Sequence, residues 1–106
     1  MAKFLIEASY SAEGMKGLQR DKGAGRTAAI KSALKAVDGQ LECVYWCLGE
    51  RDVILIADLP DTQSACALAT TVSASGLVRT KTTPLLSADE LDRALNKNIA
   101  YQPPGR

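Results

Sequence analysis

The chain has 106 residues, of which 46% are hydrophobic and 24% charged, and these proportions are typical of one globular domain spanning residues 1–106. Its 13 basic and 12 acidic residues give a formal charge of +1, so no overall positive field favours nucleic acid or an anionic membrane surface. The absence of histidine excludes Ser-His and Cys-His nucleophilic pairs and histidine-ligated zinc or haem, and we expect neither a metal nor another cofactor.

We expect no targeting signal at the N-terminus. Met1-Ala2-Lys3 leads straight into a strand-like alternation, without the long apolar region of a signal peptide. No segment approaches the ~20 apolar residues of a membrane span, and three cysteines, an odd number, suit a reducing compartment. We therefore expect a cytoplasmic protein that binds no membrane and no nucleic acid.

The first predicted strand is marked by period-two apolar residues, namely Phe4, Ile6 and Ala8. Ser11 follows as the expected N-cap of a short helix over residues 15–20, and the glycine-rich segment 23–25 should break that helix. A longer helix is predicted from about Arg26 until Asp38-Gly39 ends it. The apolar stripe of this helix must face the sheet and comprises Ala29, Ile30, Ala33, Leu34 and Val37.

Two apolar strands are predicted next, over residues 41–48 and 53–57, joined by a tight hairpin at residues 49–52. Both strands are apolar on each face, with residues such as Val44, Trp46, Ile54 and Ile56. The protein's own helices cover only one face of an open sheet, so the other face needs a second cover. We expect a second copy of the chain there, in a homodimer or a higher oligomer.

The remaining predicted elements are two helices and a fourth strand. Asp61 is the expected N-cap of a second helix, and Val78–Thr83 form a fourth strand. Ser87 and Glu90 have the spacing of a capping box that opens a third helix, after which the tail is extended. The order strand, helix, strand, strand, helix, strand is a split βαβ sandwich, which predicts an α+β fold with a four-stranded antiparallel sheet.

Three strings resemble the GYD-domain family of small bacterial proteins: Lys3–Tyr10, Gly49-x-x-Asp52 running into Val53–Pro60, and Val78–Leu86. The family is named for a Gly-x-Tyr-Asp signature, and here Arg51 occupies the tyrosine position. The resemblance spans nearly the whole chain. It implies a ferredoxin-like unit that assembles as a dimeric α+β barrel, similar to small cofactor-free monooxygenases and isomerases, and it implies no activity by itself.

Asp52 is the first candidate ligand-binding residue. At the start of a central strand beside a glycine turn, its carboxylate could orient a ligand or accept a proton. The alternative is that it accepts backbone N–H bonds that hold the hairpin, as Asx side chains do in turns. We favour this second role and keep Asp52 as a candidate.

Arg26 is the second candidate, in a segment where two glycines and basic residues meet a helix N-terminus. Such a terminus can hold a phosphate or a carboxylate. An arginine in a first helical turn also opposes the helix dipole unless an anion or an acidic side chain lies nearby. The alternative, which we favour, is a simple break in the helix.

Arg79 and Lys81 project from one face of the fourth strand, whereas Val78, Thr80 and Thr82 project from the other. If the face of the two cations lines a closed interior, it favours a small anionic ligand. Otherwise Glu7 on the neighbouring first strand is the expected counter-ion, and we favour that ion pair.

Tyr10 and Trp46 are the last two candidates. Aromatic side chains can line a mostly apolar pocket for a small molecule, although in sheets they usually pack in a core or an interface. The six candidates together would suit a small anionic or aromatic metabolite.

Two functions remain open from the sequence. The first is a non-enzymatic oligomeric module that binds a small metabolite or serves assembly. The second is a cofactor-independent monooxygenase or isomerase, which would need Tyr10, Glu13, Asp52 or Arg79 to converge on one cavity. No catalytic residue is assigned. A closed pocket with a shifted carboxylate would favour the enzyme, and a solid interior would favour the module; we favour the module.

Overall fold

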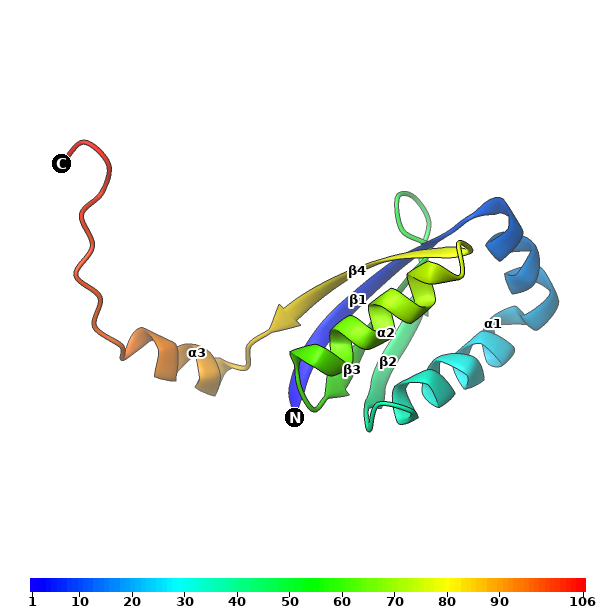
Figure 1. Cartoon of the computed structure of the whole chain (residues 1–106), viewed down its shortest axis with the longest axis horizontal. Helices are drawn as coiled ribbons and strands as arrows, with labels where there is room; N and C mark the ends of the chain where they lie inside the picture. The colour runs from blue at the N-terminus through cyan, green and yellow to red at the C-terminus, as the bar shows by residue number, and fades with distance from the viewer.

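The computed structural model describes all residues, 1–106, and its four strands form one antiparallel sheet in the order β2-β3-β1-β4. In chain order the elements are β1 (Ala2–Tyr10), α1 (Ala12–Lys35), β2 (Gln40–Trp46), β3 (Val53–Leu59), α2 (Thr62–Ala74), β4 (Val78–Leu85) and α3 (Ala88–Leu95). Helices α1 and α2 lie over one face of the sheet (Figure 1). This arrangement confirms the predicted α+β fold of ferredoxin-like order.

The hydrophobic core lies between that face of the sheet and the two helices. Alternate residues of β1 and β3 point into it because side chains along a strand alternate between faces. The seven core residues are Phe4, Ile6, Leu34, Leu55, Ala57, Leu59 and Ala65. Leu34 and Leu59 are its largest fully buried side chains, so the stripe predicted for the first long helix does face the sheet.

Side-chain caps begin all three helices, as the sequence predicts. The Ser11 hydroxyl accepts the Gly14 N–H at 3.1 Å, and the Asp61 carboxylate accepts the Ser64 N–H at 2.7 Å. Hydrogen bonding by Ser64, through its side chain and then its backbone N–H, lowers the pKa of Asp61. Ser87 and Glu90 exchange both bonds of a capping box at the start of α3. Each cap satisfies a backbone N–H that would otherwise have no partner.

Helix α1 differs from the prediction at its break. It begins at Ala12 rather than near residue 15, and its one non-helical residue is Lys22, with φ 60° and ψ 178°. The predicted break at residues 23–25 is therefore wrong by one residue, since those glycines lie in the first turn of the second half. Their low helix propensity weakens the region, but it does not select the residue that leaves the helical conformation.

The β2–β3 connection is longer than predicted. Strand β2 ends at Trp46, so residues 47–52 form a six-residue loop rather than a tight hairpin over residues 49–52. Leu48 is fully exposed in this loop, which shows that the apolar run continues past the end of the strand. Gly49 has φ 117°, a conformation that favours glycine.

The second face of the sheet has no helix over it, and we call it the open face. Val44 and Trp46 point toward α1 and are therefore covered by the chain's own helix. The open face instead carries the apolar residues Leu5, Cys43, Tyr45, Ile54 and Ile56, as the strand register places them. The prediction that the second and third strands are apolar on both faces is confirmed, although β2 lies at the edge of the sheet.

Two groups of ion pairs lie on the open face. Lys3 Nζ is 2.5 Å from Glu42 Oε1 and 3.0 Å from Asp58 Oδ1, and the bond to Glu42 is the main cause that raises the pKa of Lys3. Arg51 Nε is 3.2 Å from Glu7 Oε2, with both side chains partly buried. Arg51 is therefore paired within its own chain.

Residues 86–106 form an arm that projects from the end of β4, away from the rest of the chain (Figure 1). Helix α3 and the non-helical tail follow one another, as predicted, although α3 ends at Leu95 rather than about Lys97. No hydrogen bond or ion pair joins the arm to residues 1–85. None of the three helices combines the length and the apolar character that a bilayer span requires.

Candidate functional site

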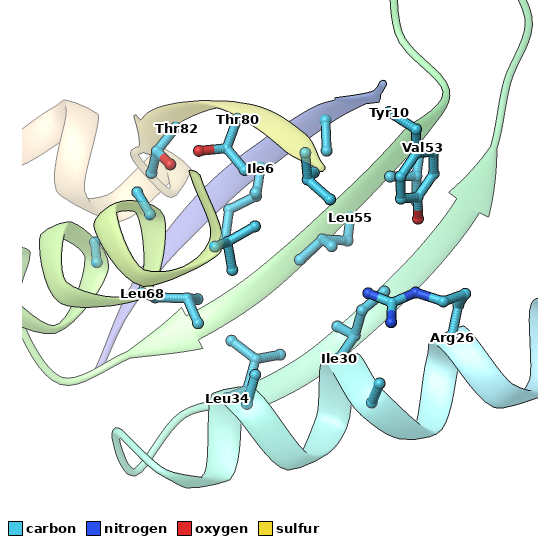
Figure 2. Close-up of a pocket in the computed structure, with 17 residues that line it drawn as sticks. Ile6, Tyr10, Arg26, Ile30, Leu34, Val53, Leu55, Leu68, Thr80 and Thr82 are labelled. Carbon is cyan, nitrogen blue, oxygen red and sulfur yellow. The ribbon is translucent and has the colours of Figure 1, made fainter. Parts of the chain in front are cut away.

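A cavity of about 100 Å³ lies between α1, α2 and the helix-covered face of the sheet (Figure 2). Fourteen of its seventeen lining residues are hydrophobic, so its interior favours an apolar group. Four of the helix residues that line it are alanines, whose short side chains leave space that larger side chains would fill. These are Ala29 and Ala33 on α1, with Ala65 and Ala69 on α2.

One end of this cavity is polar. Arg26 extends from α1 toward Tyr10 of β1 (Figure 2). Arg26 is the one charged residue in the lining, and its Nε atom is buried without a hydrogen-bond partner. Its Nη1 atom is 3.8 Å from Asp21 Oδ2, which is beyond normal hydrogen-bond length. The guanidinium therefore has free donor capacity at the cavity.

A shallower hollow of about 440 Å³ adjoins the cavity. It is lined by Glu13 and Arg20 of α1, among others. Four residues line both spaces: Tyr10, Arg26, Val72 and Val78. Tyr10 and Arg26 thus stand where the hollow meets the cavity, in the position of an entrance.

Asp52 fills a backbone role. Its Oδ2 accepts the Tyr10 N–H at 2.8 Å, and its own N–H donates to the Ala8 carbonyl at 2.9 Å. Its side chain therefore binds the backbone of the neighbouring strand β1 rather than the backbone of its own hairpin. Asp52 is not among the residues that line the cavity.

Removal of the Asp52 carboxylate should therefore lower stability. We expect Asp52→Ala to cost about 1–2 kcal/mol of unfolding free energy, because the Tyr10 N–H loses its acceptor in a partly buried position. Asp52→Asn keeps an oxygen acceptor and should cost less. Urea denaturation measures both, with Glu50→Ala in the same loop as the control. Equal stability of Asp52→Ala and Glu50→Ala would contradict this role.

Trp46 lies beside the cavity rather than in its lining. It is on the helix-covered face of β2, where its ring approaches the kink of α1: a Cβ atom at Gly23 would be 3.9 Å from Trp46 Cζ3. Its Nε1 atom is buried without a hydrogen-bond partner. Because Trp46 is the only tryptophan and packs against the segment that precedes Arg26, its fluorescence can report changes at the site.

Arg79 and Lys81 lie on the open face, away from the cavity. Lys81 is directly opposite Glu7 in the β1–β4 register, yet Glu7 pairs with Arg51. The predicted ion pair of Glu7 with these two cations is therefore wrong, because Arg51 reaches the carboxylate from the β2–β3 loop. Neither Arg79 nor Lys81 has an ion-pair partner.

The structure thus brings two of the six sequence candidates, Tyr10 and Arg26, to one cavity. It also adds residues that the sequence analysis did not assign to a site, chiefly Thr80 and Thr82 of β4 and the alanines of α2. The available signal was the recurrence of alanine at i and i+4 on both helices. No group of three or more Cys, Asp or Glu side chains lies together in a way that could hold a metal ion.

The fold and the site define a small α+β protein with an apolar cavity between a four-stranded sheet and two helices. The family model of the GYD domain matches residues 4–95, and the chain belongs to the GYD-domain family. The resemblance inferred from the sequence is thereby confirmed. The search of curated proteins and the search of solved structures both found no match.

Proposed function

We propose that this GYD-domain chain is an oligomeric module that binds a small metabolite with an apolar body and an anionic group in the cavity between α1, α2 and the sheet. The observation that carries the proposal is Arg26, the only charged residue that lines a mostly apolar cavity, with a buried and unpartnered Nε. A buried donor without a partner costs about 1–3 kcal/mol, so an anion that accepts from it would gain affinity.

The chemistry of Arg26 favours a carboxylate or a similar planar anion. A guanidinium presents a rigid fork of donors that matches two carboxylate oxygens at once. The size of the cavity limits the apolar body to at most one aromatic ring or a short branched chain, since at about 100 Å³ it is smaller than an engineered apolar cavity of ~150 Å³ that binds benzene.

The oligomeric part of the proposal rests on the open face. Apolar residues in its centre lie without cover, including Ile54 and the 66% exposed Tyr45. Contiguous apolar surface of this kind marks an interaction site, and a second copy of the chain is the simplest cover. We further propose a cytoplasmic location, because all three cysteines are unpaired.

A binding role is favoured over an enzyme because the candidate catalytic groups do not converge in the cavity. Tyr10 and Glu13 share only the shallow hollow. Asp52 is engaged with the backbone, and Arg79 is on the open face. The cavity lining contains no carboxylate that could act as a general base.

Binding of benzoate tests the proposal. We expect benzoate to bind at least ~10-fold more tightly than benzamide, which has the same shape without the charge. Arg26→Gln should remove most of this preference, because the side chain then has no charge for the carboxylate. Isothermal titration calorimetry and the fluorescence of Trp46 measure the affinities, and native mass spectrometry of gently purified protein reports any retained ligand and the subunit number.

The double variant Arg79→Gln, Lys81→Gln is the matched control. It removes two cations from the open face and should leave benzoate binding unchanged. If that control loses the preference for benzoate and Arg26→Gln keeps it, the anion site is on the open face instead. Equal affinities of the wild-type protein for benzoate and benzamide would contradict an anion site at Arg26.

A further inference from the structure

Lys22 interrupts helix α1 in a strained conformation. Its φ of 60° and ψ of 178° lie in a backbone region that is almost exclusive to glycine. Strain of this kind persists where the surrounding structure holds it, and it is concentrated at ligand sites. Gly23, the next residue, could adopt this conformation at little cost, yet the break falls on the lysine. The position of the break therefore needs an explanation.

The break brings Asp21 beside Arg26. Residues five positions apart in a continuous α-helix point about 140° apart around its axis, so they would not meet. Here Asp21 Oδ2 is 3.8 Å from Arg26 Nη1. Gly25 leaves room for the acid, because a Cβ atom at Gly25 would be 3.2 Å from Asp21 Cβ, closer than an ordinary contact. The break and the glycine together place a carboxylate beside the one charged residue of the cavity lining.

This pair stands where the polar hollow meets the apolar cavity. Arg26 lines both spaces, and Asp21 lines the hollow. The hollow also contains Glu13 and Arg20, so its acidic and basic residues are equal in number. The Asp21 side chain is half exposed, and Arg26 keeps a buried Nε without a partner. Because their separation exceeds normal hydrogen-bond length, both side chains can still bind charged groups of a ligand.

A zwitterion matches this pair better than a simple anion does. Asp21 attracts an ammonium and Arg26 attracts a carboxylate, and in an α-amino acid these two groups are joined through one carbon atom. A simple anion meets an arginine whose charge the acid already partly balances, and it leaves that acid without a cation. The apolar side chain of an amino acid can then extend into the cavity, which has room for at most one ring or a short branched chain.

We propose that the ligand of this cavity is an apolar α-amino acid. Its carboxylate binds Arg26, its ammonium binds Asp21 in the hollow, and its side chain fills the cavity. This inference rests on the proposed function, and it names the ligand class of the same site. Asp21 is then a specificity-determining residue, and the strained break at Lys22 holds it beside Arg26.

Isothermal titration calorimetry with three ligands of the same apolar shape tests the inference. The ligands are L-leucine, 4-methylpentanoate, which lacks the ammonium, and 3-methylbutylamine, which lacks the carboxylate. We expect L-leucine to bind the wild-type protein at least ~10-fold more tightly than either of the others, because it alone satisfies both charges. Equal affinities for L-leucine and 4-methylpentanoate would overturn the inference.

Asp21→Asn provides a second test. It should weaken L-leucine binding at least ~10-fold and leave 4-methylpentanoate binding unchanged or tighter, because the guanidinium then has no acidic neighbour. Glu13→Gln is the matched control, since it removes the other carboxylate of the hollow and should leave the preference for L-leucine unchanged. Loss of the preference in Glu13→Gln, with its retention in Asp21→Asn, would overturn the role of Asp21.

The outcomes separate this inference from the proposed function. If benzoate and 4-methylpentanoate bind through Arg26, as Arg26→Gln would show, and L-leucine binds no better, the anion site stands and the amino-acid ligand is overturned. If Arg26→Gln leaves the binding of all these ligands unchanged, both proposals are overturned. Absence of binding by L-leucine, 4-methylpentanoate and 3-methylbutylamine overturns the amino-acid ligand, whereas benzoate still tests the anion site by itself.

Discussion

Replacement of Leu34 by alanine is expected to lower the unfolding free energy by about 2–5 kcal/mol. Leu34 is 1% exposed, belongs to the core cluster and also lines the cavity. Its loss would remove buried apolar surface and enlarge a space that the neighbouring alanines already leave unfilled. Urea denaturation measures the change, and Leu48→Ala, at a fully exposed loop position, should stay within about 0.5 kcal/mol of the wild-type protein.

The Leu34→Ala variant also tests whether the cavity binds ligands. A ligand that binds only the folded state stabilises it by an amount that grows with the logarithm of the ratio of its concentration to the dissociation constant. A two-ring carboxylate such as 1-naphthoate should therefore raise the melting temperature of Leu34→Ala more than that of the wild-type protein, because only the variant has room for the second ring. Equal shifts in the two proteins would indicate that the ligand binds elsewhere.

Replacement of Gly14 by alanine should be nearly as costly, at about 3 kcal/mol, the upper end of the usual range for overpacking. A Cβ atom at Gly14 would lie 2.3 Å from the Leu77 carbonyl oxygen. This oxygen is a backbone atom, and it already accepts the Ser11 N–H at 2.8 Å. It cannot move without loss of the hydrogen bond that joins the start of α1 to the segment before β4.

Gly17→Ala is the matched control for this prediction. Gly17 lies one turn further along α1, and the nearest atom to its added Cβ would be an Arg20 side-chain nitrogen at 4.0 Å. Alanine is favoured over glycine inside a helix by roughly 0.5–1 kcal/mol, so this variant should be more stable than the wild-type protein. Thermal unfolding of the two variants should give shifts of opposite sign. A stable Gly14→Ala would mean that α1 and the segment before β4 are not in close contact.

Interactions between near neighbours in the chain were predictable from the sequence. The caps at Ser11 and Asp61, and the capping box of Ser87 with Glu90, each join residues three positions apart, so their spacing alone identifies them. The strand periodicity of Phe4, Ile6 and Ala8 likewise needs no distant partner. From these local signals the order of elements followed, and with it the ferredoxin-like α+β fold.

The site depended on contacts between distant segments. The backbone amide that Asp52 accepts belongs to Tyr10, and the acid that pairs with Arg51 is Glu7, each more than forty positions away. The sequence pattern predicted that Glu7 pairs with a cation on the neighbouring fourth strand. It pairs with Arg51 instead, and this outcome depends on the length of the β2–β3 loop and on the reach of the arginine side chain.

The sequence by itself determined the fold class, the side-chain caps of the helices and the two-sided apolar character of the second and third strands, because propensity, capping and period act over a few residues. Only the tertiary structure decided that Tyr10 and Arg26 share a cavity while Arg79 and Lys81 lie on the opposite face of the sheet. The cavity is lined by alanines of two helices, and its size depends on how far apart α1 and α2 lie on the sheet. That separation is set by packing across the whole core, which no local pattern specifies.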